Sequence, residues 1–245
     1  IIHTQGNAAL NLSGSYQAVD GRINAKEMTI AAQDFRQTDN AMVNADKLEL
    51  NLRGQLDNRH SRLLSQTHLN ISSLQADNRQ GEIIAQGQVN IDTQAQPLLM
   101  EGGKLLGQQG VTLRTGELDN RHGQISGANI DIESKALENS QGKILTEQKL
   151  QLRLQEGYRA NKGRIEAGEG EISAKVFKQS DESAVVSTGV LRINTQDALV
   201  NTDSLLFSRN QLDVTASHIN SSRGKMVSEK GRLTVDARGR DLISE

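Results

Sequence analysis

The sequence predicts an all-β fold, a right-handed parallel β-helix of about twelve coils of 19–22 residues that occupies residues 1–245 as a single segment. Three observations carry this prediction. An apolar-polar-apolar triplet recurs at nearly constant spacing, a turn signal recurs at a fixed place between triplets, and the composition is short of large apolar residues, with 35% hydrophobic and 2% aromatic residues. A conventional globular core of this size normally contains more aromatic side chains.

The triplet is the anchor of each coil. Its apolar positions are Leu10/Leu12, Met28/Ile30, Leu48/Leu50, Leu69/Ile71, Val89/Ile91, Val111/Leu113, Ile130/Ile132, Leu150/Leu152, Leu191/Ile193, Leu212/Val214 and Leu233/Val235. The one gap in this series is filled at the expected place by Gly170-Glu171-Ile172. Alternation with a period of two is the signature of a strand, so the flanking residues face inward and the polar middle residue faces solvent.

Two further apolar columns recur in the same phase. One follows the turn, at Ile83/Ile84, Ile125, Ile144/Leu145, Leu205/Leu206 and Met226/Val227. The other precedes the turn, at Leu56, Leu74, Leu118, Leu137, Leu199 and Ile219. Three short apolar stretches per coil predict a three-sided coil.

The turn between these columns has Asn followed three residues later by Gly or Ser. The residues expected to build the corner and its ladder are Asn58, Asn78, Gly81, Asn120, Gly123, Asn139, Gly142 and Asn201. Gly and Asn tolerate the left-handed backbone that such a corner needs. Stacked Asn side chains can also hydrogen-bond from coil to coil.

A coil of about 20 residues without helical periodicity buries its apolar edge only by stacking on similar coils. Parallel crossovers favour the right-handed sense. At roughly 4.8 Å per coil, twelve coils give a rod of roughly 55–60 Å. Ladders of aliphatic side chains then explain the shortage of aromatics; a flat polar β-sandwich of long hairpins is the alternative fold.

Two stretches depart from the repeat. Residues 94–110 contain Pro97, the only proline, which we place at a bend because proline lacks a backbone donor. Residues 154–190 contain Tyr158, Phe177 and several acidic residues. Departures from a repeat often map to functional loops, although drift in a tolerant repeat is the simpler explanation. We therefore take Tyr158, Arg159, Glu166, Glu169 and Phe177 as the candidate binding surface.

Residues with catalytic or ligating potential form no convincing site. His60 and His122 share a turn position but lie three coils apart, roughly 14 Å along the axis, too far to share a metal ion. Arg59, Arg79 and Arg121 follow the turn Asn and either form a basic edge for glycans or phosphates or are solvated corner residues. Glu166, Glu169 and Glu171 lack the stacking aromatics and the facing carboxylates of carbohydrate-active β-helices. We expect no enzymatic activity, no metal and no cofactor.

Charge and composition limit the partners. The formal charge is −2, without a long run of one sign, so we expect neither nucleic-acid binding nor membrane insertion. The chain contains no cysteine, so it has no disulfide framework. It also contains no stretch of 18 apolar residues, the length at which a stretch becomes a candidate transmembrane helix. It begins at Ile1 without a signal peptide or initiating Met, and we expect it to be a piece of a longer protein.

The phrases LDNRHGQI, LDNRHS and ALENSQGKIL resemble the filamentous haemagglutinin repeats of large bacterial exoproteins exported by two-partner secretion. That family includes adhesins and contact-dependent growth inhibition effectors. The resemblance implies a secreted or cell-surface shaft that is exported by an outer-membrane transporter and meets a target-cell receptor or glycan. The export and toxin-border motifs typical of the family, N-P-N-L and V-E-N-N, are not in this sequence. We expect a monomer with some end-to-end association; a receptor-binding module and a carbohydrate-active β-helix are the alternative functions.

Overall fold

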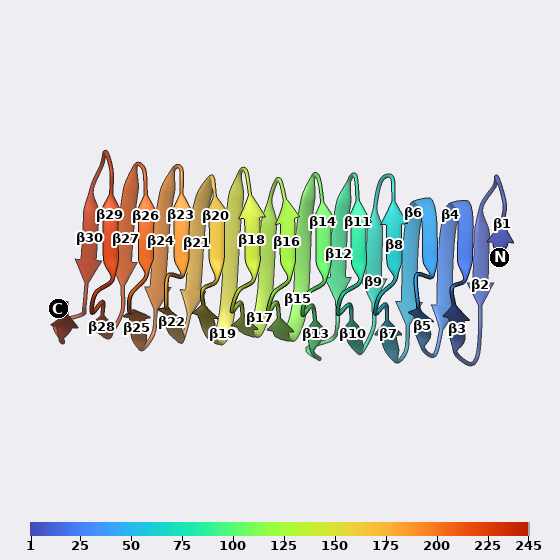
Figure 1. The fold of residues 1–245 in the computed structure, drawn as a ribbon, viewed down its shortest axis with the longest axis horizontal. Coiled ribbons are helices and arrows are strands. Elements are labelled where there is room, and N and C mark those ends of the chain that lie inside the picture. Colours follow the sequence, from blue (N-terminus) through green and yellow to red (C-terminus); the bar gives the residue numbers. More distant parts are fainter. Residues whose placement is uncertain (245) are drawn as a thin grey trace.

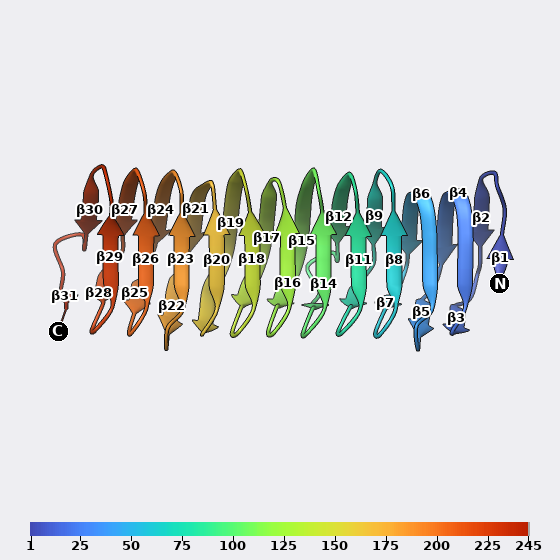
Figure 2. The ribbon, with the colours of Figure 1, turned by 45° about the horizontal axis from the view of Figure 1, so that its top comes forward.

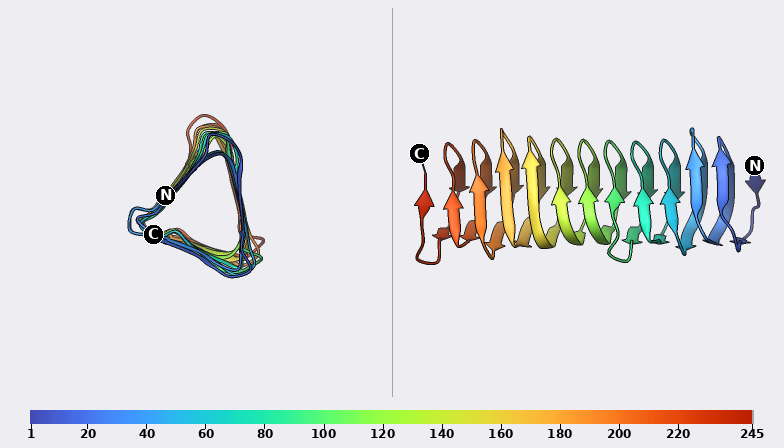
Figure 3. Two further views of the ribbon diagram at one scale, coloured as in Figure 1. Left: turned by 90° about the vertical axis from the view of Figure 1, so that its right-hand side faces the viewer. Right: turned by 90° about the horizontal axis from the view of Figure 1, so that it is seen from below.

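Thirty-one β-strands and no helix make up residues 1–244, the part of the chain that the computed structural model describes. The chain winds along one axis, with its ends at opposite ends of the rod (Figures 1 and 2). Viewed along that axis, successive coils superpose as a triangle (Figure 3). The three-sided coil predicted from the apolar columns is therefore confirmed.

The first side, which we call the polar face, carries the predicted triplets. Five of its strands are long and turn a corner into a neighbouring side: β4 (Arg22–Ala32), β6 (Met42–Leu52), β15 (Gly110–Asp119), β17 (Ile130–Glu138) and β19 (Lys149–Asn161). The other seven are β2 (Ala8–Asn11), β9 (Leu69–Ser72), β12 (Gln88–Asp92), β21 (Glu169–Ala174), β24 (Val190–Thr195), β27 (Gln211–Thr215) and β30 (Leu233–Asp236). Twelve strands on this side confirm the predicted number of coils.

The second side, the stripe face, follows the corner turn. It contains the first halves of β4 and β6 together with β1 (Ile2–His3), β8 (Arg62–Ser65), β11 (Glu82–Ala85), β14 (Lys104–Gly107), β16 (Gln124–Gly127), β18 (Lys143–Thr146), β20 (Arg164–Ala167), β23 (Ala184–Ser187), β26 (Leu205–Ser208) and β29 (Lys225–Ser228). Each strand pairs in parallel with the equivalent strand of the next coil, for example β8 with β11 and β11 with β14.

The third side precedes the corner turn, so we call it the corner face. It contains the last parts of β15, β17 and β19 together with β3 (Tyr16–Val19), β5 (Phe35–Thr38), β7 (Gln55–Asp57), β10 (Gln75–Asp77), β13 (Leu98–Leu99), β22 (Val176–Ser180), β25 (Ala198–Asn201), β28 (His218–Asn220) and β31 (Leu242–Ile243). All strand pairings in the described chain are parallel, which excludes the sandwich of hairpins.

Aliphatic ladders fill the interior, as predicted. The triplet residues stack in register, such as Leu48 on Leu69 and Leu50 on Ile71, and these four side chains are at most 3% exposed. At the gap in the series, Gly170 leaves room that the Leu191 side chain fills, since a Cβ on Gly170 would lie 2.8 Å from Leu191 Cδ1.

Two of the predicted inward positions are wrong by two residues, which is one full period of the in-out alternation. Leu10 stacks on Ile30 rather than on Met28, so the first triplet is Ala8/Leu10 and not Leu10/Leu12. Leu74 is 41% exposed, and Ala76 takes the predicted inward place above Leu56. A shift of two residues preserves the in-out alternation, so the pattern alone does not fix it.

The two irregular stretches remain part of the stack. In residues 94–110 the departure is a turn at Gln94 and Ala95, both with positive φ. Pro97 follows after one further residue, and its carbonyl accepts a hydrogen bond from the Ala76 N–H. Strands in residues 154–190 pair with both neighbouring coils. The only irregularity there is one extra residue opposite Ser134–Ala136, a β-bulge, so no loop projects from this region.

Candidate functional site

The corner between the corner face and the stripe face is the most regular polar feature of the molecule. Its left-handed residue is the second after the turn Asn: His60 (φ 53°), Gln80 (φ 55°), His122 (φ 54°) and Gln141 (φ 55°). At these four corners the expectation that the turn Asn or Gly itself takes this conformation is therefore wrong, whereas Gly102 (φ 65°) does take it two residues after Met100. Both histidines are exposed corner residues, in agreement with their predicted place.

The corner glycines are required for a different reason, which is close approach to the coil before. A Cβ on Gly142 would lie 2.1 Å from the Asn120 carbonyl oxygen, and one on Gly81 would lie 2.2 Å from that of Asn58. Real Cβ atoms do not approach oxygen this closely, so a side chain here would push two coils apart.

The predicted Asn ladder exists and is buried. Asn58 Nδ2 donates to Asn78 Oδ1 at 2.6 Å, and Asn120 Nδ2 donates to Asn139 Oδ1 at 2.7 Å. Gln37 and Gln179, which the turn pattern did not identify, extend the same column by donating to Asn58 and Asn201. Asn58 and Asn120 each also donate to a backbone carbonyl of the next coil, so the ladder fixes the register of the corners that it joins.

Two interruptions divide the ladder. Met100 and Ala160 occupy the column, and the amide oxygens of the next residues, Asn120 Oδ1 and Gln179 Oε1, are buried without a partner. Ahead of the second interruption, Asn139 Nδ2 donates to the Tyr158 hydroxyl at 3.3 Å. A buried acceptor without a donor destabilises the fold, so these are weak points of the stack.

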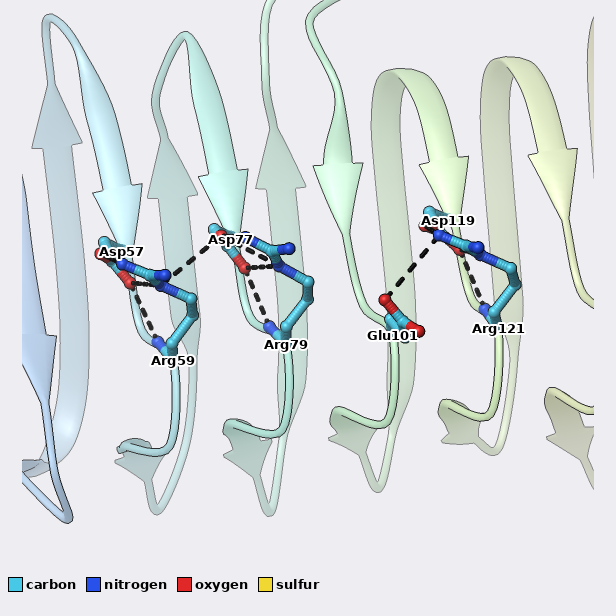
Figure 4. Close-up of polar contacts among 7 residues, drawn as sticks. All are labelled: Asp57, Arg59, Asp77, Arg79, Glu101, Asp119 and Arg121. Atoms are coloured by element: carbon cyan, nitrogen blue, oxygen red, sulfur yellow. Dashed lines mark hydrogen bonds and ion pairs between the residues drawn. The ribbon is translucent and has the colours of Figure 1, made fainter.

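Aspartate two residues before each corner Arg neutralises the predicted basic edge (Figure 4). Arg59 and Arg121 each donate through Nε and an Nη to Asp57 and Asp119, at 2.6–2.9 Å, and Arg79 pairs with Asp77 in the same way. The Arg backbone N–H donates to the same carboxylate. These arginines are solvated, paired corner residues and not an anion-binding edge.

The environment of these carboxylates shifts their acidity. Burial raises the pKa of Asp57 and Asp119, but hydrogen bonds from the Arg59 or Arg121 side chain and backbone N–H, together with the Arg charge, outweigh it and the net pKa is lowered. The same contacts raise the pKa of the two arginines. Both ion pairs, Asp57–Arg59 and Asp119–Arg121, are therefore charged at neutral pH.

The predicted binding surface is not one surface. Tyr158 and Phe177 are 2% and 0% exposed and stack on each other in the core with ring centroids 4.7 Å apart, so their assignment to a surface is wrong. They occupy the column of Leu137 and Leu199. Their spacing from those leucines was the signal that the prediction overlooked.

The remaining three residues lie on different strands and sides. Arg159 belongs to the corner face in β19, Glu166 to the stripe face in β20, and Glu169 begins β21 on the polar face. Glu166 is ion-paired with Arg164 of its own strand. Glu171 points outward on the polar face, so the three glutamates do not converge on one cleft.

Other features of the described residues are modest. An open depression of about 720 Å³ lies over the late corners, between Lys162 and Lys225, and mixes basic, acidic and Ser side chains. Within residues 1–244, no three His, Asp or Glu side chains gather as a metal site. That part of the chain also has no helix long and apolar enough to cross a membrane.

One surface feature was missed: the outward middle column of the stripe face is apolar. Its half-buried members are Leu64, Ile84, Leu106, Leu145, Val186, Phe207 and Val227, interrupted by Ser126 and Glu166. We call this column the outer stripe. The apolar doublets, such as Ile83-Ile84, contained the signal, because in a strand only one residue of a doublet faces inward.

Comparison with known proteins gives one match. The haemagglutinin repeat family model matches residues 1–60, 40–96, 98–153 and 161–242. No curated protein and no solved structure matches the chain. The four matched segments cover nearly all coils, and the chain belongs to the haemagglutinin repeat family.

Proposed function

We propose that this chain is the structural and adhesive shaft of a secreted or cell-surface bacterial exoprotein, which holds binding or toxic segments at a distance from the producing cell. The observation that carries the proposal is the unbroken parallel pairing from β1 to β31, in which each coil contacts chiefly its neighbours. Such a stack contributes length and stiffness in proportion to the number of coils. Membership of the haemagglutinin repeat family supports a secreted or surface location.

The partners that follow are an outer-membrane two-partner-secretion transporter during export and a receptor or glycan on the target cell. Coil-by-coil stacking suits this route, because each emerging coil finds a finished template in the coil before it. Whether the shaft serves an adhesin or a growth-inhibition effector depends on segments carried by the parent protein.

The residues on which the two alternative functions depend do not form the sites that those functions need. A receptor-binding module in residues 154–190 relied on Tyr158 and Phe177, which are core residues. A carbohydrate-active site relied on glutamates that lie on two sides of the rod. The shaft is therefore the function that the geometry supports best.

The test is removal of one whole coil in the parent exoprotein. Deleting residues 111–129 brings Ile130 into the place of Val111, its partner in the neighbouring coil, so every later residue keeps its register. A matched control deletes only residues 111–120, which breaks the register. The shaft predicts export and target-cell attachment for the whole-coil deletion and loss of export for the control.

Loss of attachment by the exported whole-coil variant would place the binding function in that coil and contradict the shaft. Equal export of both variants would contradict the requirement for register.

A further inference from the structure

The outer stripe distinguishes the stripe face from the polar face. Corresponding outward positions on the polar face are polar, such as Asn70, Asn90 and Thr112. On the stripe face, seven of nine successive coils carry a half-buried apolar side chain at this position, and Ser126 and Glu166 occupy the other two. A row of outward apolar side chains of this length marks an interaction site.

The side chains of the outer stripe differ in size. Near its middle, Ser126 interrupts it, and the following Gly127 and Ala128 are also small. Together with Leu106 and Leu145 they line a notch of about 460 Å³. Phe207, the largest side chain of the outer stripe, lies four coils further along, through Leu145, Glu166 and Val186.

We propose that the outer stripe binds a second copy of this chain, face to face and antiparallel, with a two-fold axis through the coil of Glu166. Glu166 lies two coils from Ser126 and two coils from Phe207. This axis therefore seats Phe207 of each copy in the notch of the other. It also sets Leu145 against Val186, and Leu106 against Val227.

Size complementarity selects the antiparallel arrangement over the parallel one. In a parallel face-to-face pair, equivalent coils meet, so Phe207 would face Phe207 and the notch at Ser126 would face an equal notch. Two opposed side chains and two opposed voids pack poorly, whereas the antiparallel pair fills the void with the ring. A closed two-fold contact of this kind uses the same patch on both copies.

One pair of charges supports this register. Arg209 lies two residues after Phe207, faces outward and pairs with Glu229 of its own chain at 3.7 Å; in the antiparallel pair it comes over Ala128 and beside Glu147 of the second copy. Glu147 forms no ion pair within the described chain. At the axis, Glu166 faces Glu166 and Arg164 faces Arg164 of the second copy, and each Glu166 keeps the Arg164 of its own chain as its ion-pair partner, so the centre of the contact has no net charge.

The shape of the stripe face permits the contact. Seen along the axis, its strands superpose with little twist from coil to coil (Figure 3). A nearly flat face allows several coils to stay in contact at once, which a strongly twisted sheet does not.

The experiment uses single cysteines, because the chain has no native cysteine. Glu166→Cys places two thiols across the two-fold axis with their Cα atoms roughly 10 Å apart, the spacing of stacked sheets, where a short bis-maleimide cross-linker is expected to form a covalent dimer. Ser126→Cys is the matched control in the same column: four coil steps of roughly 4.8 Å separate the two copies of this residue by roughly 19 Å. A cross-linker that spans roughly 10 Å joins the first pair and does not reach across the second.

Dimer formation by Glu166→Cys with little by Ser126→Cys supports the proposal. Equal cross-linking of both variants indicates parallel or random contact and overturns it, as does the absence of cross-linking in both. A second measurement follows association by sedimentation: Ser126→Phe fills the notch and is expected to raise the dissociation constant about tenfold or more. An unchanged dissociation constant, with unchanged circular dichroism, also overturns the proposal.

Discussion

The buried amide ladder makes a sharp prediction for the substitution Asn78→Asp. Asn78 is 0% exposed, its Oδ1 accepts from Asn58, and its Nδ2 donates to the carbonyl oxygens of Gly81 and Lys104 at 3.1 and 3.3 Å. Aspartate has the same shape but replaces Nδ2 by an oxygen. Two carbonyl acceptors then face an acceptor, and either a charge is buried or the carboxyl stays protonated.

The charged and the protonated form of the new carboxyl give the same magnitude for the loss in the free energy of unfolding. Burying an unpaired charge in a folded protein costs about 3–5 kcal/mol. Keeping the carboxyl protonated at pH 7 costs about 4 kcal/mol, because its ordinary pKa is about 3.9 and each pH unit corresponds to about 1.4 kcal/mol. We therefore expect the free energy of unfolding to fall by about 4 kcal/mol at pH 7.

The matched control is Asn90→Asp. Asn90 donates to Asn70 at 2.8 Å, in the same coil-to-coil manner, but on the wetter polar face, where it is half-buried. Its replacement is expected to cost about 1 kcal/mol or less. The difference between the two variants isolates burial from the loss of one amide contact.

Urea unfolding followed by circular dichroism measures both variants, at pH 7 and at pH 4. The carboxyl introduced at position 78 has a raised pKa in the folded state, so its penalty is full at pH 7 and shrinks as the pH falls towards the unfolded pKa. Equal stability losses in the two variants, or a penalty at position 78 that does not depend on pH, would refute the reasoning.

Three further predictions test the corner and the core. Gly142→Ala places a Cβ 2.1 Å from the Asn120 carbonyl oxygen and is expected to cost about 2–3 kcal/mol in thermal or urea unfolding, whereas Gly14→Ala, with open space around it, is expected to cost about 0.5 kcal/mol or less; equal losses would contradict close approach as the cause. The lowered pKa of Asp119 contributes stability above its unfolded pKa that is lost as the pH falls through its folded pKa, so Asp119→Asn is expected to flatten the acid limb of the stability curve, and an unchanged limb would contradict the corner pairing. Burial raises the pKa of Tyr158, so the stability that its neutral hydroxyl contributes is lost as the pH rises above about 10. Tyr158→Phe is expected to remove this alkaline loss and to lower the free energy of unfolding by about 1 kcal/mol at pH 7. An alkaline limb of the stability curve that persists in the variant would argue against burial of the hydroxyl.

The architecture was predictable because the repeat carries the same information many times. Triplets such as Leu69/Ile71 and Val89/Ile91 identify the strands and, by their spacing, the register between coils. The failures at Leu10 and Leu74 occurred where a further small or apolar residue lies two positions away, so that the alternation fits two registers.

The surface was less predictable, for physical reasons that differ by residue. Tyr158 and Phe177 look like departures from the repeat, yet stacking on each other lets two rings occupy consecutive steps of an aliphatic column. Corner glycines were assigned to a left-handed backbone, whereas they are small because a carbonyl of the coil before lies against them. The outer stripe depends on which residue of each doublet points outward, and the neighbouring coils decide that.

The central claim, a stack in which one coil is the unit of length, is tested most directly by a distance between two spin labels. Glu49 and Gln151 occupy the same outward column of the polar face, five coil steps apart. Labels on Glu49→Cys and Gln151→Cys are expected roughly 24 Å apart along the axis, and deletion of residues 111–129 is expected to shorten this distance by roughly 5 Å. An unchanged distance, or a deletion variant that no longer folds, would contradict the account.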